Sequence, residues 1–291
     1  MTTELVRSRL TAGRVPARRR TLRRDWLLHV ILVVCSALMV VPFVWEILTA
    51  FKTRNEVASL PPTLFPAHPT FGGFETFFAS VPFLAQLGVS IGALVLRVVG
   101  QVIVSALAAY AFARLHFPGR NALFVVFLIM LMVPSQLFLL GQFDLIKTLG
   151  LLNTLPALAI PGIFSAFGTF LLRTAFLTMP SDYEEAARID GAGTLRIFWS
   201  IMLPLARPMI AALVVLTSLY SWNDLLWPLI VAPLGDNRPL TVGLASIQGQ
   251  FGTDFPTLMA GSIVCTLPLV IIFLVLQRQF FEGIANSGLK G

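Results

Sequence analysis

Six long apolar blocks, separated by polar or proline-rich segments, dominate the pattern of this chain. Each block has about twenty residues or more, the length that crosses the hydrocarbon core of a bilayer as an α-helix. The blocks cover about residues 26–49, 86–112, 121–140, 156–178, 209–232 and 257–280. The pattern therefore predicts an all-α membrane protein with six transmembrane helices, the first of them an uncleaved span.

The segments between the blocks divide the chain into four parts. These are a basic N-terminal arm (1–25), a first span with a proline-containing extramembrane loop (26–85), a core of five spans (86–281) and a short tail (282–291). Within the core, the amphipathic segment 181–204 follows the fourth block. We expect this segment to lie outside the bilayer, because its charged residues are too frequent for a span.

Composition agrees with a membrane location. Apolar residues make up 56% of the 291 positions and charged residues only 12%, whereas a soluble domain carries about a quarter charged residues. The two cysteines, Cys35 and Cys265, lie in different apolar blocks, so no disulfide framework is expected.

Basic residues are distributed unequally between alternate loops. Fifteen lie on one side, counting eight in the N-terminal arm, and four lie on the other. Because cytoplasmic loops retain Lys and Arg, both termini are predicted to be cytoplasmic. The retention of basic residues in cytoplasmic loops therefore also accounts for the net charge of +7. No basic stripe is interleaved with aromatic residues, so nucleic-acid binding is not expected.

The sequence offers no catalytic or metal-binding constellation. The three histidines are dispersed, and none of the three lysines belongs to a phosphate-binding loop: they are His29, His68 and His116, and Lys52, Lys147 and Lys290. If ATP drives this protein, another chain must bind the ATP and its Mg²⁺.

A short helix is predicted after the fourth block. Ser181 can cap it, Glu184 stands where a capping box needs an acidic side chain, and Gly191 suits the turn that ends it. About nine residues give roughly 14 Å, too short to cross a bilayer. Local signals alone predict an interfacial helix that contacts either a partner protein or lipid headgroups.

The same segment resembles a known family. Glu185-Ala186-Ala187, then Gly191, then Ile201-x-Leu203-Pro204, is similar at every spacing to the EAA signature of binding-protein-dependent ABC importer permeases. Further segments resemble the subfamily that includes the smaller maltose-type permease: Phe51-Lys52-Thr53, residues 108–114, Ser221-Trp222-Asn223-Asp224 and the C-terminal end. The resemblance covers nearly all of the chain after Asp25.

This resemblance implies a coupling role for the short helix. In the family, such helices dock into a cleft on a separate ATPase, and closure of the ATPase dimer then rocks two permeases. The residues that match the coupling region are Glu184, Glu185, Ala186, Ala187, Asp190, Gly191, Ile201, Leu203 and Pro204. The implied partners are a second permease subunit in a heterodimer, two ATP-binding subunits that hold ATP and Mg²⁺, an extracytoplasmic solute-binding protein and membrane lipid.

Polar residues within the apolar blocks are candidates for a translocation path. They are Arg97, Gln136, Trp222, Asn223 and Asp224. An ionisable group at membrane depth is either functional or part of a hydrogen-bonded network between helices, and both interpretations stay open for Arg97 and Asp224. In the loop before the last block, Gln248, Gln250 and Phe251 are candidates for contact with the binding protein, as the resemblance implies.

The sequence therefore indicates a multi-pass permease subunit in a prokaryotic plasma membrane, with no cofactor or catalysis of its own, that serves an ATP-driven importer of sugars or related polyols by alternating access. An ion-coupled secondary transporter is a weaker alternative, because no internal repeat is evident. A membrane scaffold without transport is a further alternative.

Overall fold

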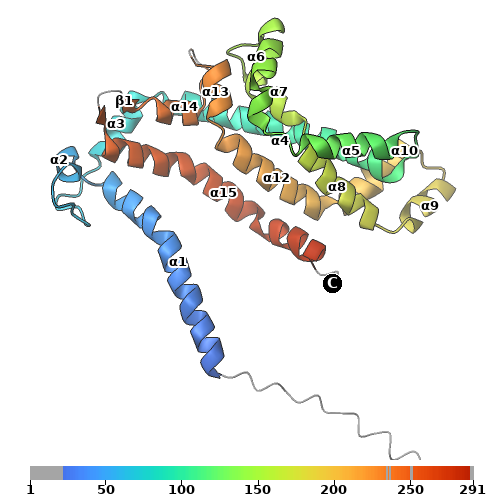
Figure 1. Ribbon diagram of the computed structural model, residues 1–291, viewed down its shortest axis with the longest axis horizontal. Coiled ribbons are helices and arrows are strands. Elements are labelled where there is room, and N and C mark those ends of the chain that lie inside the picture. Colours follow the sequence, from blue (N-terminus) through green and yellow to red (C-terminus); the bar gives the residue numbers. More distant parts are fainter. Residues whose placement is uncertain (1–21, 234, 236, 250–251, 289–291) are drawn as a thin grey trace, which may run out of the picture.

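The computed structural model describes residues 22–233, 235, 237–249 and 252–288. Most of the N-terminal arm, the end of the tail, and the predicted binding-protein contacts Gln250 and Phe251 lie outside the described residues. Apart from loops and turns, the described residues form helices and one two-stranded antiparallel hairpin, β1 (Gln248–Gly249) with β2 (Gly252–Thr253), inside the predicted loop. The helices form an elongated body (Figure 1).

Three of the described helices are long and apolar enough to cross a membrane on their own. They are α1 (Leu22–Ala50), α4 (Phe83–Arg114) and α15 (Phe255–Gly288). They agree with the first, second and last predicted spans. In Figure 1, α1 splays away from the body, and its buried residues are at its C-terminal end, Thr49 and Ala50.

Three further apolar stretches are bent pairs of helices. The first joins α5 (Arg120–Met130) to a 3₁₀ turn (Ser135–Phe138) and α6 (Leu139–Thr148), at 98°. The second joins α7 (Leu155–Ile163) to α8 (Ala166–Thr178), at 48°. The third joins residues 194–205 to α12 (Arg207–Trp222), at 75°. If each pair is one crossing, the total is six, but the third pair then includes residues 194–205, whereas the sequence places the segment 181–204 outside the bilayer and the fifth span at 209–232.

The predicted span 156–178 breaks at Phe164 and Ser165, between α7 and α8. The predicted spans 121–140 and 209–232 are not continuous helices either. The first breaks around Pro134, and the second ends at Trp222 before α13 (Leu226–Val231) begins. Proline removes a backbone donor and favours extended backbone in the residue before it, which explains the first break. The second break has Asp224 at its centre and Pro228 in the first turn of α13.

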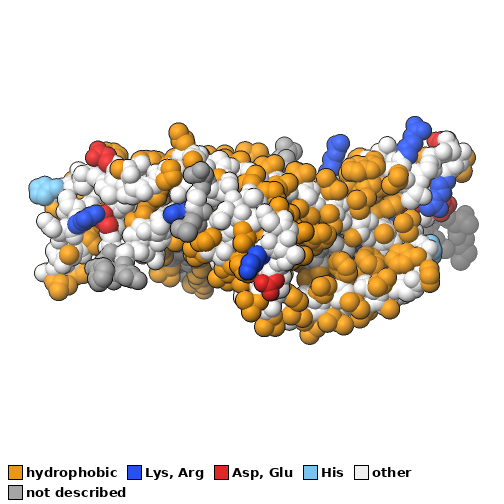
Figure 2. All heavy atoms as spheres, turned by 90° about the horizontal axis from the view of Figure 1, so that it is seen from above, with side chains coloured by type: hydrophobic (Ala, Val, Ile, Leu, Met, Phe, Trp, Pro, Cys, Tyr) orange, Lys and Arg blue, Asp and Glu red, His pale blue; other side chains and the backbone are white. Residues whose placement is uncertain are grey.

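Short elements occupy the two ends of the body. At one end lie α2 (Arg54–Val57), α3 (Gly72–Ser80), α14 (Leu240–Ala245) and the hairpin. At the other end lie α9 (Asp182–Ile189), α10 (Thr194–Ile197), a π-helical segment (Phe198–Met202) and α11 (Leu203–Leu205). Figure 2 shows hydrophobic side chains over the middle of the body and charged side chains mainly toward its ends, as a protein with a lipid-facing girdle requires.

Helix α4 is the central packing element, in contact with α7, α8 and α12. Two carbonyls that prolines leave without a helical donor are satisfied by neighbouring side chains. Pro161 frees the carbonyl of Ala157, which accepts a hydrogen bond from Trp227 Nε1 at 2.9 Å. Pro228 frees the carbonyl of Asp224, which accepts one from Thr241 Oγ1 at 2.9 Å. Broken helices are tolerated at membrane depth because protein groups restore the lost bonds in this way.

Candidate functional site

Helix α9 lies at one end of the body and has two distinct faces (Figure 1). Glu184 and Ala187 are buried against the bundle. Tyr183 is 52% exposed and Ile189 is 87% exposed, and Glu185 and Ala186 also lie at the surface. A short helix with one face anchored and the other free has the form of a docking element.

The predicted capping box at the start of α9 is wrong. Ser181 has helical backbone angles, φ −68° and ψ −24°, and its side chain makes no capping hydrogen bond. A capping hydroxyl needs an extended residue at this position, so Ser181 joins the first turn instead, and its carbonyl accepts from the amides of Glu184 and Glu185. The acidic side chains still favour a helix start through the helix dipole.

The predicted glycine turn at the end of α9 is confirmed. Gly191 has φ +79°, in the left-handed region where a side chain is strained. The amide of Ala192 donates to the carbonyl of Ala187 at 2.9 Å, which closes the helix end. Asp190 precedes this turn and is exposed. The chain therefore reverses sharply at Gly191, as the sequence indicated.

The second half of the motif, Ile201-x-Leu203-Pro204, packs against the same apolar cluster as α9. Ile201, Leu203 and Pro204 are half-buried. Ile201 and Leu203 pack against a buried apolar cluster that includes Phe198 and Met202. The motif's hydrophobic residues thus form a base for α9.

Arg114, the last residue of α4, contacts both α8 and α9. Its Nε lies 3.1 Å from Glu184 Oε1. Its Nη2 donates to the carbonyls of Phe176 and Met179, each at 2.6 Å, where α8 ends. Arg114 counts among the basic residues of the loops predicted to be cytoplasmic, and it ends the segment 108–114, which resembles the subfamily. That resemblance was the signal that could have marked it.

The structure brings together two of the predicted path residues, Arg97 and Asp224. Arg97 Nη1 lies 3.1 Å from Asp224 Oδ2, and both side chains are about one-fifth exposed, at 20% and 23%. Asp224 also caps α13, because its Oδ1 accepts from the amide of Trp227 at 3.4 Å. The Arg97 side chain crosses Gly162, where an added Cβ would lie 1.9 Å from Arg97 Nε. The pair therefore joins α4 to the breaks in two other helices.

The other predicted path residues do not join this ion pair. Trp222 is buried and donates to the carbonyl of Cys265 in α15 at 2.8 Å. Asn223 is exposed and donates to the carbonyl of Leu219, one turn earlier. Gln136 lies in the exposed 3₁₀ turn before α6. In this structure, Trp222 and Asn223 stabilise the end of α12.

At the opposite end, the hairpin base is fixed by an ion pair. Gln248 is exposed on β1. Arg54 Nη2 lies 2.5 Å from Asp254 Oδ2, and Thr257 also donates to Asp254. Burial alone would raise the pKa of Asp254, but the hydrogen bonds from Arg54 and Thr257 outweigh it and hold that pKa below its usual range. The pair therefore persists at neutral pH.

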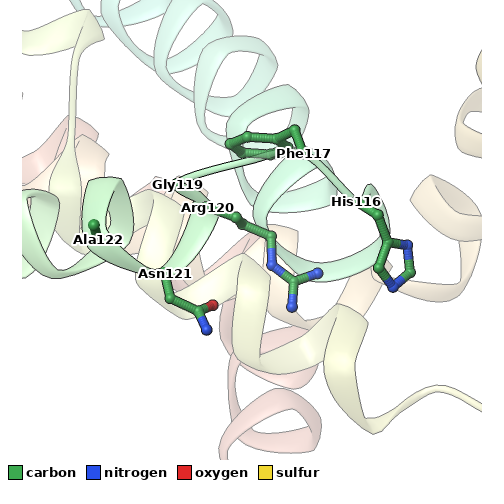
Figure 3. Close-up of a pocket in the computed structure, with 6 residues that line it drawn as sticks. All are labelled: His116, Phe117, Gly119, Arg120, Asn121 and Ala122. Carbon is green, nitrogen blue, oxygen red and sulfur yellow. The ribbon is translucent and has the colours of Figure 1, made fainter.

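A small hollow of about 280 Å³ lies in the loop between α4 and α5. Figure 3 shows His116, Arg120 and Asn121 on one side of this loop, with Phe117 turned away. Arg120 Nη1 donates to the carbonyl of Leu115 at 3.0 Å, so the guanidinium stabilises the loop between α4 and α5. Across the part of the chain that the structure describes, no three His, Cys, Asp or Glu side chains form a group able to hold a metal ion.

These features define a class: a polytopic α-helical membrane protein with broken helices in its core and an anchored surface helix at one end. Residues 101–284 match the family model described as "Binding-protein-dependent transport system inner membrane component". The chain belongs to this family, and it is a permease subunit of an ABC importer.

Curated relatives cover nearly the whole chain. The arabinooligosaccharide transport permease AraQ of Halalkalibacterium halodurans is 35% identical over 92% of this chain and 97% of its own length. The sn-glycerol-3-phosphate transport permease UgpE of Yersinia pestis is 33% identical over 90% and 96%. The lactose transport permease LacG of Rhizobium radiobacter is 32% identical over 92% and 98%.

A solved structure has the same fold. It belongs to a bacterial ABC transporter that imports the acidic polysaccharide alginate, and it matches with a TM-score of 0.79 over 91% of this chain and 99% of that chain, at 22% identity. A second structure, of the alginate transporter in complex with a periplasmic protein bound to alginate pentasaccharide, matches with a TM-score of 0.61 at 16% identity, over 88% and 94%.

Proposed function

We propose that this chain is one of two different transmembrane subunits in an importer of sugars or related polyols, and that α9 docks into a separate ATPase that binds ATP and Mg²⁺. The observation that carries the coupling role is the form of α9: an anchored helix at the end of the bundle, closed by a left-handed glycine, with an exposed opposite face. A rigid helix of this kind transmits displacement.

The substrate class follows from the relatives, whose names specify arabinooligosaccharides, glycerol 3-phosphate and lactose. Each of these solutes carries at least two hydroxyl groups, and glycerol 3-phosphate also carries a phosphate. The proposed complex has a second permease, two ATP-binding subunits and an extracytoplasmic binding protein, in a prokaryotic plasma membrane. The charge asymmetry of the loops supports cytoplasmic termini.

Two parts of the chain have proposed roles along the path. The hairpin segment with Gln248 contacts the binding protein when the importer is open outward. The Arg97–Asp224 pair supports the path at membrane depth, because it links α4 to two helix breaks. Broken helices are the usual frame of transport sites in membranes.

The test is purification of the tagged chain from its native membrane in mild detergent. An ATPase subunit and a second permease should purify with it, and a solute-loaded binding protein should stimulate ATP hydrolysis by the complex. Glu185→Ala, on the exposed face of α9, should weaken retention of the ATPase while the chain still inserts. Purification of the chain without any ATPase, under conditions that preserve its uptake activity, would refute the proposal.

A further inference from the structure

Arg114 joins the ends of three helices at one point. It is the last residue of α4, it donates to two carbonyls at the C-terminal end of α8, and it pairs with Glu184 of α9. The side chains of Arg114 and Glu184 are 14% and 7% exposed. The Arg114–Glu184 contact is an ion pair without hydrogen-bond alignment of Nε and Oε1, while the planar guanidinium holds the two carbonyls of α8 in fixed directions through Nη2.

The surroundings of this contact make it stiff. Tyr110, one turn earlier in α4, packs edge-on against Phe176 of α8 with ring centroids 5.9 Å apart, and against Phe198 at 5.2 Å. These rings belong to the same buried cluster as Ala187 of α9. Packed interiors shift between discrete arrangements more readily than they deform, so a contact embedded in such a cluster transmits displacement.

Glu184 and Glu185, the adjacent glutamates of α9, have different environments. The Glu184 carboxylate faces inward, where Oε1 meets Arg114 and Oε2 lies 3.6 Å from Arg188. Glu185 is exposed. Of these two glutamates, only Glu185 is therefore free to meet a partner.

We propose that Arg114 is the positioning residue that locks α9 to the ends of α4 and α8, so that a displacement of α9 moves both helices as one body. This rests on the proposed docking of α9 to the ATPase. It adds that Glu184 acts inside the chain, through Arg114, and not on the partner.

The experiment uses the complete transporter in lipid nanodiscs, with spin labels at Val99 on α4 and Asp182 on α9, both exposed. The distance between the labels is measured by electron–electron resonance without nucleotide and with Mg-ATP plus vanadate, which closes the ATPase. In the parent the distance distribution should stay narrow and unchanged on closure. In Arg114→Gln and Glu184→Gln it should broaden or shift on closure.

Activity provides a second measurement on the same samples. Arg114→Gln should lower the ATP hydrolysis stimulated by the binding protein roughly tenfold, because it removes the link from α9 to α4 and α8 and leaves Glu184 with only the exposed Arg188 as a counter-charge. Subunit stoichiometry should stay unchanged, and Arg114→Lys should recover part of the loss because it keeps the charge. Arg120→Gln is the matched control: it removes an arginine-to-carbonyl hydrogen bond at the same end, and that bond lies within the loop between α4 and α5.

Two results would overturn the proposal: a distance that changes on closure in the parent, or one that stays equally narrow in Arg114→Gln. Loss of the ATPase from Glu184→Gln but not from Arg114→Gln would place Glu184 at the partner and overturn it as well. The docking role fails separately, if Glu185→Ala leaves both retention of the ATPase and stimulated hydrolysis at the parent level.

Discussion

Arg97 lies within an apolar helix and Asp224 in the break between two apolar helices, where an isolated charge would cost several kcal/mol. Their separation of 127 residues explains why sequence analysis could identify each as unusual but could not pair them. The local role of Asp224 as the cap of α13 was equally hidden, because the pattern predicted an unbroken span there. Glu184 is a third such case. Its spacing from Ser181 fits a capping box, but in the structure it pairs with Arg114, which lies 70 residues away in sequence.

The Arg97–Asp224 pair gives a prediction for stability. Arg97→Met leaves a carboxylate without its cation and should destabilise the protein by about 1–3 kcal/mol, discounted for partial exposure. The double variant Arg97→Met/Asp224→Asn should recover much of that loss, because asparagine still caps α13 and no charge remains. Thermal unfolding of the purified complex measures both.

The same variants separate the two interpretations that the sequence left open. A structural pair predicts that uptake by the double variant follows its recovered stability. Recovered stability with uptake still abolished would assign the pair to the translocation path. Additive destabilisation in the double variant would contradict the ion pair itself.

Helices form in this chain where local signals and the apolar pattern agree, and they break where tertiary contacts permit it. The helix Asp182–Ile189 was predicted from a capping box that does not form and from Gly191, whose left-handed turn does form. The bend near Pro134 could be suspected from the proline, but its angle of 98° depends on neighbours that the sequence does not display. The same holds for Pro161, whose freed carbonyl is satisfied by a tryptophan 70 residues away.

Gly191 offers a prediction at this scale, with a neighbour as its control. Gly191 and Gly193 are both exposed, and an added Cβ would meet no atom within 4 Å at either, but only Gly191 has a positive φ. Gly191→Val should therefore strain the turn by about 1–2 kcal/mol and lower uptake, whereas Gly193→Val should not. Uptake is measured at equal amounts of inserted protein. Equal uptake by both variants would show that the left-handed turn does not contribute to coupling.

At the scale of the molecule, the described residues form a frame of three long helices and three bent pairs, with charged short elements at its two ends. The sequence predicted the class, the membrane location and the anchored end, because those depend on composition, block length and one local motif. It did not predict how the breaks meet around α4. That arrangement depends on the close approach of side chains to neighbouring helix backbones, as where the Arg97 side chain crosses Gly162.

The central claim is that this chain imports a hydroxyl-rich solute only together with an ATPase. The most direct measurement is uptake into proteoliposomes that contain the purified complex, with the binding protein and a radiolabelled solute chosen by its binding to that protein. Uptake should require ATP inside the vesicles, where the ATPase subunits face the lumen. It should disappear when the ATPase subunits are omitted. Uptake by the permeases alone, driven by a proton or sodium gradient, would contradict the account.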